Sequence, residues 1–120
     1  MKEIEVYTDG ACSGNPGAGG WAFLALCKGE VLHKASGKEA LTTNNKMELT
    51  AAIKALEYIK DQDYKVSIYT DSTYLKNGIT QWINSWKKNN WRTSSRLPVK
   101  NKDLWVHFCL LYTSPSPRDA

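Results

Sequence analysis

The chain has 120 residues, of which 42% are hydrophobic and 23% charged, and its formal net charge is +4. These values predict one soluble, globular domain with a modest core. No apolar run approaches the roughly 18 residues of a membrane-spanning helix, which argues against a membrane protein.

The start of the chain and its cysteines predict a cytoplasmic protein. Acidic residues occupy the segment "MKEIEVYTDG", where a signal peptide would need an apolar stretch. Cys12, Cys27 and Cys109 are an odd number of cysteines without metal-binding spacing. Reduced thiols are therefore the simplest interpretation.

Positive charge gathers in one segment, residues 76–102, which we call the basic lobe. It contains seven basic residues and no acidic one, whereas the rest of the chain has 9 basic and 12 acidic residues. A basic lobe on a slightly acidic body suggests a polyanionic partner. For Lys87 and Lys88 the alternative is an ordinary solvated face.

The first part of the chain predicts a three-stranded antiparallel meander. The expected strands cover 3–9, 21–27 and 30–36. Between the first two, residues 10–20 contain five glycines and a proline, which predicts a loop. That loop is not a phosphate-binding loop, because it lacks the Gly-Lys-Ser/Thr sequence and opens a strand instead of a helix.

The second part predicts helices and one further strand. The expected elements are a long helix within 42–62, a strand at 65–70, short helices at about 72–78 and 80–89, and a helix starting near 100. Because a helix precedes it, the fourth strand should lie parallel to the first through a right-handed crossover. The fold class is therefore α/β, more strictly an α+β mixed sheet with helices packed on it.

The tripeptide Tyr-Thr-Asp occurs twice, at 7–9 and 69–71, at the ends of the two strands expected to be parallel. Neighbouring strands lie about 4.8 Å apart. Asp9 and Asp71 should therefore project into one small volume at the sheet edge where such folds place their sites. One pKa should rise unless a cation lies between them, and oxygen ligands favour Mg²⁺ or Mn²⁺. For each aspartate alone, a turn at the strand end is the alternative.

Glu48 is a third candidate acid, near the start of the long helix. Ala51, Ala52 and Ala55 fall on its side of that helix, and such small side chains allow a close approach to the sheet. Glu48 would then face inward. The alternative is a capping box with Asn45, since acids favour helix N-termini.

Four segments in order, "YTDGACSGNPG", "TTNNKMELTAAIKALE", "YTDSTYLKNGITQWINSWKKNNW" and "PVKNKDLW", resemble bacterial type 1 ribonuclease H. The resemblance implies a ribonuclease H-like fold and an endonuclease that hydrolyses the RNA strand of RNA–DNA hybrids. It also implies two divalent ions and products with 5′-phosphate and 3′-hydroxyl ends. Asp9, Glu48 and Asp71 match three of the family's four metal-binding acids, and Gly10 belongs to the same metal site.

The resemblance covers residues 3 to about 106, so some family features lie beyond it. These are the fourth acid, a mobile histidine, the fifth strand and the last helix. We expect residues 1–108 to form a ribonuclease H domain that is incomplete at its C-terminus. Residues 109–120 should be a non-native tail, with a genuine disordered terminus as the alternative. His107 receives no catalytic role, and the chain should be poorly stable and weakly active or inactive.

The resemblance also implies a hybrid-binding surface. Short polar side chains suit the shallow minor groove of a hybrid, and basic residues suit its phosphates. The predicted hybrid-binding residues are Cys12, Asn15, Thr43, Asn44, Asn45, Ser72, Thr73, Trp82, Trp86, Lys87, Lys88, Trp91 and Arg92. The amides have helix caps and turns as alternatives, and the tryptophans are expected to fix the lobe by packing more than by stacking on bases.

The expected partner is an RNA–DNA hybrid, bound by a monomer away from membranes. The runner-up function is a non-catalytic hybrid-binding module, because the fourth acid and the mobile histidine are missing. A third possibility is an α/β domain without a role in nucleic-acid binding.

Overall fold

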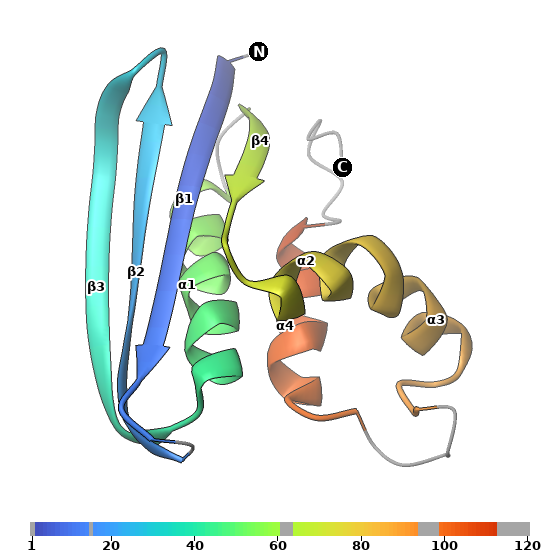
Figure 1. Ribbon diagram of the computed structural model, residues 1–120. Coiled ribbons are helices and arrows are strands. Elements are labelled where there is room, and N and C mark those ends of the chain that lie inside the picture. The colour runs from blue at the N-terminus through green and yellow to red at the C-terminus, as the bar shows by residue number, and fades with distance from the viewer. Residues whose placement is uncertain (1, 15, 61–63, 94–98, 113–120) are drawn as a thin grey trace.

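The structure is a computed structural model that describes residues 2–14, 16–60, 64–93 and 99–112 (Figure 1). Its elements in chain order are β1 (Lys2–Cys12), β2 (Gly17–Cys27), β3 (Glu30–Thr42), α1 (Asn44–Ile59), β4 (Tyr64–Tyr69), α2 (Thr73–Asn77), the π-helical turn η1 (Gly78–Trp82), α3 (Ile83–Lys88) and α4 (Lys102–Tyr112).

The four strands form one mixed sheet in the order β3-β2-β1-β4. Strands β1, β2 and β3 are antiparallel neighbours, and β4 lies parallel to β1. This arrangement confirms the predicted meander with its added parallel strand. A tight turn joins β2 to β3, in which Lys28 and Gly29 adopt positive φ values of 53° and 82°, as tight hairpin turns require.

The glycine-rich segment 10–20 is mostly strand, so the predicted loop is wrong. β1 continues to Cys12 and β2 begins at Gly17, with Cys12 opposite Gly19. A Cβ on Gly19 would lie 2.6 Å from the Cγ2 of Thr42. The glycines therefore allow close packing at the base of the sheet. Because glycines have no side chains, these strand residues pair through their backbones without the alternating side-chain pattern that identifies a strand in a sequence.

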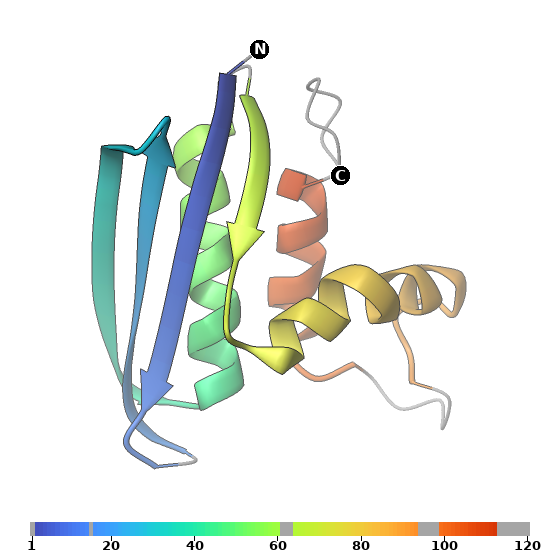
Figure 2. The same ribbon diagram turned by 45° about the horizontal axis from the view of Figure 1, so that its top comes forward.

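Helix α1 packs on one face of the sheet, against β1 and β2 (Figures 1 and 2). Ala51, Ala52 and Ala55 are buried, as their small size predicts for a helix lying close to a sheet. On the opposite face the stacked rings of Tyr7 and Tyr69 are 41% and 47% exposed. The core therefore lies between the sheet and the helices.

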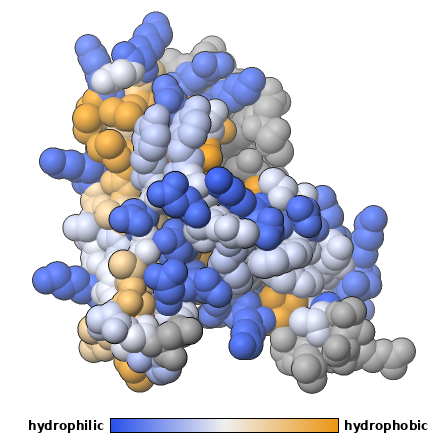
Figure 3. Space-filling view, viewed as in Figure 1, coloured by the Kyte–Doolittle hydropathy of each residue, from blue (hydrophilic) through white to orange (hydrophobic). Residues whose placement is uncertain are grey.

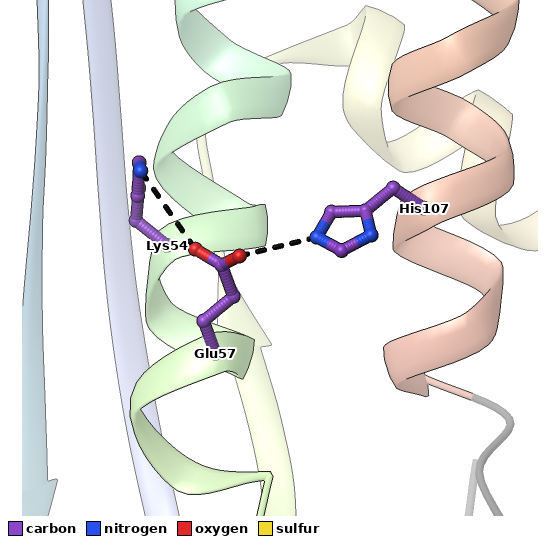
Figure 4. Close-up of polar contacts among 3 residues, drawn as sticks. All are labelled: Lys54, Glu57 and His107. Atoms are coloured by element: carbon purple, nitrogen blue, oxygen red, sulfur yellow. Dashed lines mark hydrogen bonds and ion pairs between the residues drawn. The ribbon is translucent and has the colours of Figure 1, made fainter.

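Helix α4 lies beside α1, and a contact between His107 of α4 and Glu57 of α1 joins the two helices (Figure 4). The Nε2 of His107 lies 3.1 Å from the Oε2 of Glu57, and the Nζ of Lys54 lies 3.8 Å from the Oε1 of Glu57. These groups are largely exposed, and such pairs contribute at most about 1 kcal/mol. His107 thus has a structural contact that links the two helices.

Helix α4 extends past residue 108, where the sequence suggested that the domain ends. It continues to Tyr112, and Cys109 and Leu111 are buried within the core. The first residues of the predicted tail thus complete a helix. Residues 113–120 lie outside the described part of the chain.

Most of the surface in Figure 3 is hydrophilic. Hydrophobic colour gathers over the end of the sheet near the β2–β3 turn, where Val31 is 58% and Leu32 40% exposed. Within the four described ranges, no helix has the length and apolar character needed to cross a bilayer.

Candidate active site

The two Tyr-Thr-Asp copies meet at one edge of the sheet. Tyr7 and Tyr69 form the last parallel pair between β1 and β4, so Asp9 and Asp71 each lie two residues beyond it. Asp71 follows the end of β4 as predicted. Asp9 does not end its strand, because β1 continues past it and Asp9 pairs with Ala22 of β2.

Glu48 reaches this edge from α1. Its side chain is only 7% exposed, and its Oε1 accepts a hydrogen bond of 3.2 Å from the N–H of Gly10. A Cβ on Gly10 would lie 2.5 Å from backbone atoms of Met47 and Glu48. Only glycine therefore lets β1 approach α1 closely enough for this hydrogen bond.

The alternative role of Glu48 in a capping box is wrong. Thr43 is the N-cap of α1, and its side chain accepts a hydrogen bond of 3.2 Å from the N–H of Lys46. The Glu48 carboxylate is bonded to Gly10 of the sheet instead of its own helix N-terminus. Glu48 therefore belongs to the edge that carries the two aspartates.

Burial raises the pKa of Glu48 above its ordinary value. The hydrogen bond from Gly10 opposes this shift, while the negative charges of Asp9 and Asp71 raise the pKa further. All three carboxylates are thus close enough to interact electrostatically. The site concentrates negative charge around one buried acid, which a cation would relieve.

The carboxylates do not form a compact cluster on their own. Among the described residues, no three His, Cys, Asp or Glu side chains are placed to hold one metal ion. Asp9 and Asp71 are exposed, and they line two neighbouring hollows that share Tyr7 and Thr8. The structure brings the acids to one edge, where Glu48 is buried and both aspartates are exposed.

Two polar residues at this edge were not singled out from the sequence. Thr8 is buried, and its hydroxyl has no hydrogen-bond partner among the described residues. Lys76 lines the same hollow as Asp71. The sequence feature that could have identified Thr8 is its place in the repeated tripeptide. The position of Lys76 could not be predicted, because it depends on the direction of α2 after the end of β4.

Four of the predicted hybrid-binding residues gather where β1 meets the start of α1. The thiol of Cys12 contacts the backbone carbonyls of Thr42 and Gly17 at 3.2 and 3.4 Å. Asn44 and Asn45 are exposed in the first turn of α1, and neither amide is engaged in a hydrogen bond within the described residues. Thr43 caps the helix, as described above.

Asn15, another predicted hybrid-binding residue, lies outside the described residues. Ser72 and Thr73, which follow Asp71, shape the start of α2. Ser72 is the N-cap of α2, and its Oγ accepts a hydrogen bond of 3.1 Å from the N–H of Leu75. Thr73 is exposed. These residues therefore lie beside Asp71.

The tryptophans of the basic lobe pack against one another. The ring of Trp86 lies 5.8 Å from that of Trp82, 6.1 Å from Trp91 and 5.6 Å from Trp105, measured between centroids. This is the packing role that the sequence favours for them. Lys87, Lys88 and Arg92 are exposed on the same lobe.

Comparison with known proteins agrees with this fold. A family model described as RNase H matches residues 1–114. The chain is 58% identical over 105 residues to a ribonuclease H from Hydrogenovibrio crunogenus, which covers 88% of this chain and 71% of that relative. LC9-RNase H1, a type 1 RNase H with the type 2 active-site motif, superposes with a TM-score of 0.83 and 27% identity, over 99% of this chain and 61% of that one.

A further solved structure, LC11-RNase H1 in complex with an RNA/DNA hybrid, shares the fold. Its TM-score is 0.74 at 24% identity, and the match covers 97% of this chain and 80% of that one. The family model spans every described element of the chain. The chain belongs to the RNase H family.

Proposed function

We propose that this chain is an endonuclease that hydrolyses the RNA strand of RNA–DNA hybrids and leaves 5′-phosphate and 3′-hydroxyl ends. The observation that carries the proposal is the acid edge: buried Glu48, its pKa raised, within the electrostatic reach of Asp9 and Asp71. Family membership supplies the reaction class, since the relatives are ribonucleases H. The chain spans about 71% of the relative quoted above, so the activity of a whole protein is part of the proposal.

The donor set fits a hard divalent cation such as Mg²⁺, with Mn²⁺ as the alternative, and we propose two ions when substrate is bound. Carboxylate oxygens suit such ions, and a buried acid with a raised pKa releases its proton readily when a cation arrives. Bound ions would activate water and stabilise the leaving oxygen. Asp9 and Asp71 are exposed, so their side chains can turn toward Glu48 to complete the set.

Other residues of the chain would position Glu48 and contact the hybrid. Gly10 holds the Glu48 carboxylate in place through its N–H. Asn44 and Asn45 offer unengaged amides to the minor groove of a hybrid. Exposed Lys87, Lys88 and Arg92 supply the phosphate contacts that hold the duplex across the edge.

The second candidate is a hybrid-binding module without catalysis. The observation in its favour is that no compact group of three metal ligands exists among the described residues. The basic lobe and the amides of α1 would then bind the hybrid as before. The two candidates differ only in whether the bound RNA strand is cut.

We also propose that the protein acts as a cytoplasmic monomer. The cytoplasmic location rests on an odd number of cysteines without metal-binding spacing, and the monomer rests on the solvated surface of the basic lobe. Gel filtration with light scattering tests the monomer, and a stable dimer at micromolar concentration would contradict it.

The testing experiment is a single-turnover assay with excess protein and a hybrid labelled on the RNA strand. With Mg²⁺ or Mn²⁺, we expect RNA fragments whose 3′-hydroxyl ends a polymerase can extend, and no cutting of the DNA strand. Asp9→Asn should abolish cutting and retain binding. Binding without cutting by the unchanged chain would favour the module, and the absence of salt-dependent binding would contradict both candidates.

A further inference from the structure

The basic lobe is joined to the acid edge by a very short connection. Asp71 is followed by the cap residue Ser72, and α2 begins at Thr73. Helix α2 continues through η1 into α3 without a loop, as Figures 1 and 2 show. Any tilt of α2 therefore moves the whole lobe relative to Asp71.

Tyr74, the second residue of α2, is tied to α4. Its hydroxyl oxygen accepts hydrogen bonds from the Nε1–H of Trp105 at 2.8 Å and from the Nδ2–H of Asn101 at 3.3 Å. Its ring also lies 5.5 Å from the ring of Trp105 and 5.6 Å from that of Trp82. One side chain therefore connects the acid edge, the lobe and α4.

Trp105 is a fixed partner for this contact. Its side chain is fully buried, and its ring also packs edge-on against Phe108 and Trp86. The ring stacking contributes attraction that tolerates some tilt, whereas hydrogen bonds depend on direction. The two hydrogen bonds to Tyr74 are thus the angular constraint at this joint.

Gly78 adds a second constraint one turn further on. A Cβ on Gly78 would lie 2.0 Å from the Cη2 of Trp105, so the first residue of η1 lies in close contact with α4 at this glycine. The π-helical turn η1 begins at the same residue, and such widened turns are often found at functional positions. The lobe is therefore held against Trp105 at two points.

We propose that Tyr74 is a positioning residue: through Trp105 its hydroxyl fixes the angle of the basic lobe to the acid edge, so that one hybrid engages both together. The inference rests on the proposed function. Its physical basis is pre-organisation, since a lobe already held at the binding angle loses less freedom when the duplex binds. The affinity for a duplex that reaches only the acid edge should not depend on that angle.

The experiment compares Tyr74→Phe with Tyr58→Phe, which removes the same atom from a tyrosine of α1 whose ring packs against His33 of β3. Both are made in the Asp9→Asn background, which keeps the RNA intact, and affinity is measured for hybrids of two lengths. Residues 73–88 rise roughly 24 Å as a helix, so a 5-bp hybrid of roughly 17 Å cannot span edge and lobe, whereas an 18-bp hybrid can.

Tyr74→Phe should weaken binding of the 18-bp hybrid about threefold to tenfold, the range of one or two hydrogen bonds. It should leave the 5-bp hybrid unchanged, and Tyr58→Phe should affect neither. Gly78→Ala, which displaces the lobe sterically, should show the same selectivity for length.

Equal weakening at both lengths would mean that Tyr74 has only a structural role, and unchanged affinity for the long hybrid would overturn the proposal outright. If the unchanged protein binds neither hybrid, the proposed function itself fails and the positioning role fails with it. Circular dichroism of each variant at the assay temperature confirms that the compared proteins are folded.

Discussion

At the scale of single residues, the site depends on two unlike neighbours, Gly10 and Glu48. The glycine lets β1 approach α1, and its N–H then binds the buried carboxylate. Sequence alone indicated that Glu48 faces inward, because the alanines beside it leave room for the sheet. It did not indicate the partner, because a contact between Gly10 and Glu48 depends on how two distant elements pack.

The raised pKa of Glu48 predicts how stability depends on pH in the absence of divalent ions. Burial penalises the charged form of the Glu48 carboxyl. The contribution of neutral Glu48 to the free energy of unfolding is therefore fully present below the pKa that Glu48 has in the unfolded chain, and it is lost as the pH rises through its pKa in the folded protein. Glu48→Gln should therefore unfold at a higher urea concentration than the unchanged protein at pH 7.5, with the difference vanishing near pH 4.

The control for this prediction is Glu39→Gln, at an exposed position on β3. Its unfolding midpoint should follow that of the unchanged protein across the pH range. The buried-charge account would be contradicted if the stability of Glu48→Gln relative to the unchanged chain were lower at pH 7.5 than at pH 4.

At the scale of elements, the sequence predicted the types and order well and their limits less well. The four strands and the long helix lie where their patterns place them, but β3 continues to Thr42 instead of ending at residue 36. β1 and β2 are longer than predicted because Gly10, Gly17 and Gly19 pair through backbone groups and carry no side-chain signal. The break expected between two helices after Asp71 is a continuous π-helical turn, because Gly78 packs on Trp105 from a distant helix.

The cap of α1 gives a prediction at this scale. Thr43→Ala removes the side-chain acceptor for the N–H of Lys46 and should lower the free energy of unfolding by about 1 kcal/mol. Thr43→Ser keeps the acceptor and should stay within a few tenths of a kcal/mol of the unchanged protein. Urea unfolding followed by circular dichroism measures both, and equal stability of the alanine and serine variants would exclude the cap.

At the scale of the whole molecule, charge and shape are arranged for a long anionic duplex. The acids and the α1 amides lie at one end of the sheet, and α2 to α3 carry the exposed lysines away from it (Figures 1 and 2). The basic lobe was evident in the sequence from its lack of acids. Its angle to the site was not, because that angle depends on contacts among Tyr74, Gly78 and Trp105.

Salt dependence tests this arrangement. Replacing Lys87 and Lys88 together by alanine should reduce the slope of log affinity against log salt for hybrid binding by about 2, because each lysine that binds a phosphate contributes about 1 to that slope. Lys60→Ala, exposed at the far end of α1, should leave the slope unchanged. Equal slopes for all three proteins would show that the lobe does not bind phosphates.

The most direct test of the central claim is to measure hybrid binding and RNA-strand cleavage together, for the unchanged chain and for Asp71→Asn. The account predicts divalent-dependent cleavage of the RNA strand alone, slow but detectable with excess protein, and its loss in the variant at nearly unchanged affinity. Cleavage that continues in Asp71→Asn, or that needs no divalent ion, would contradict the assignment of the acid edge as the catalytic site.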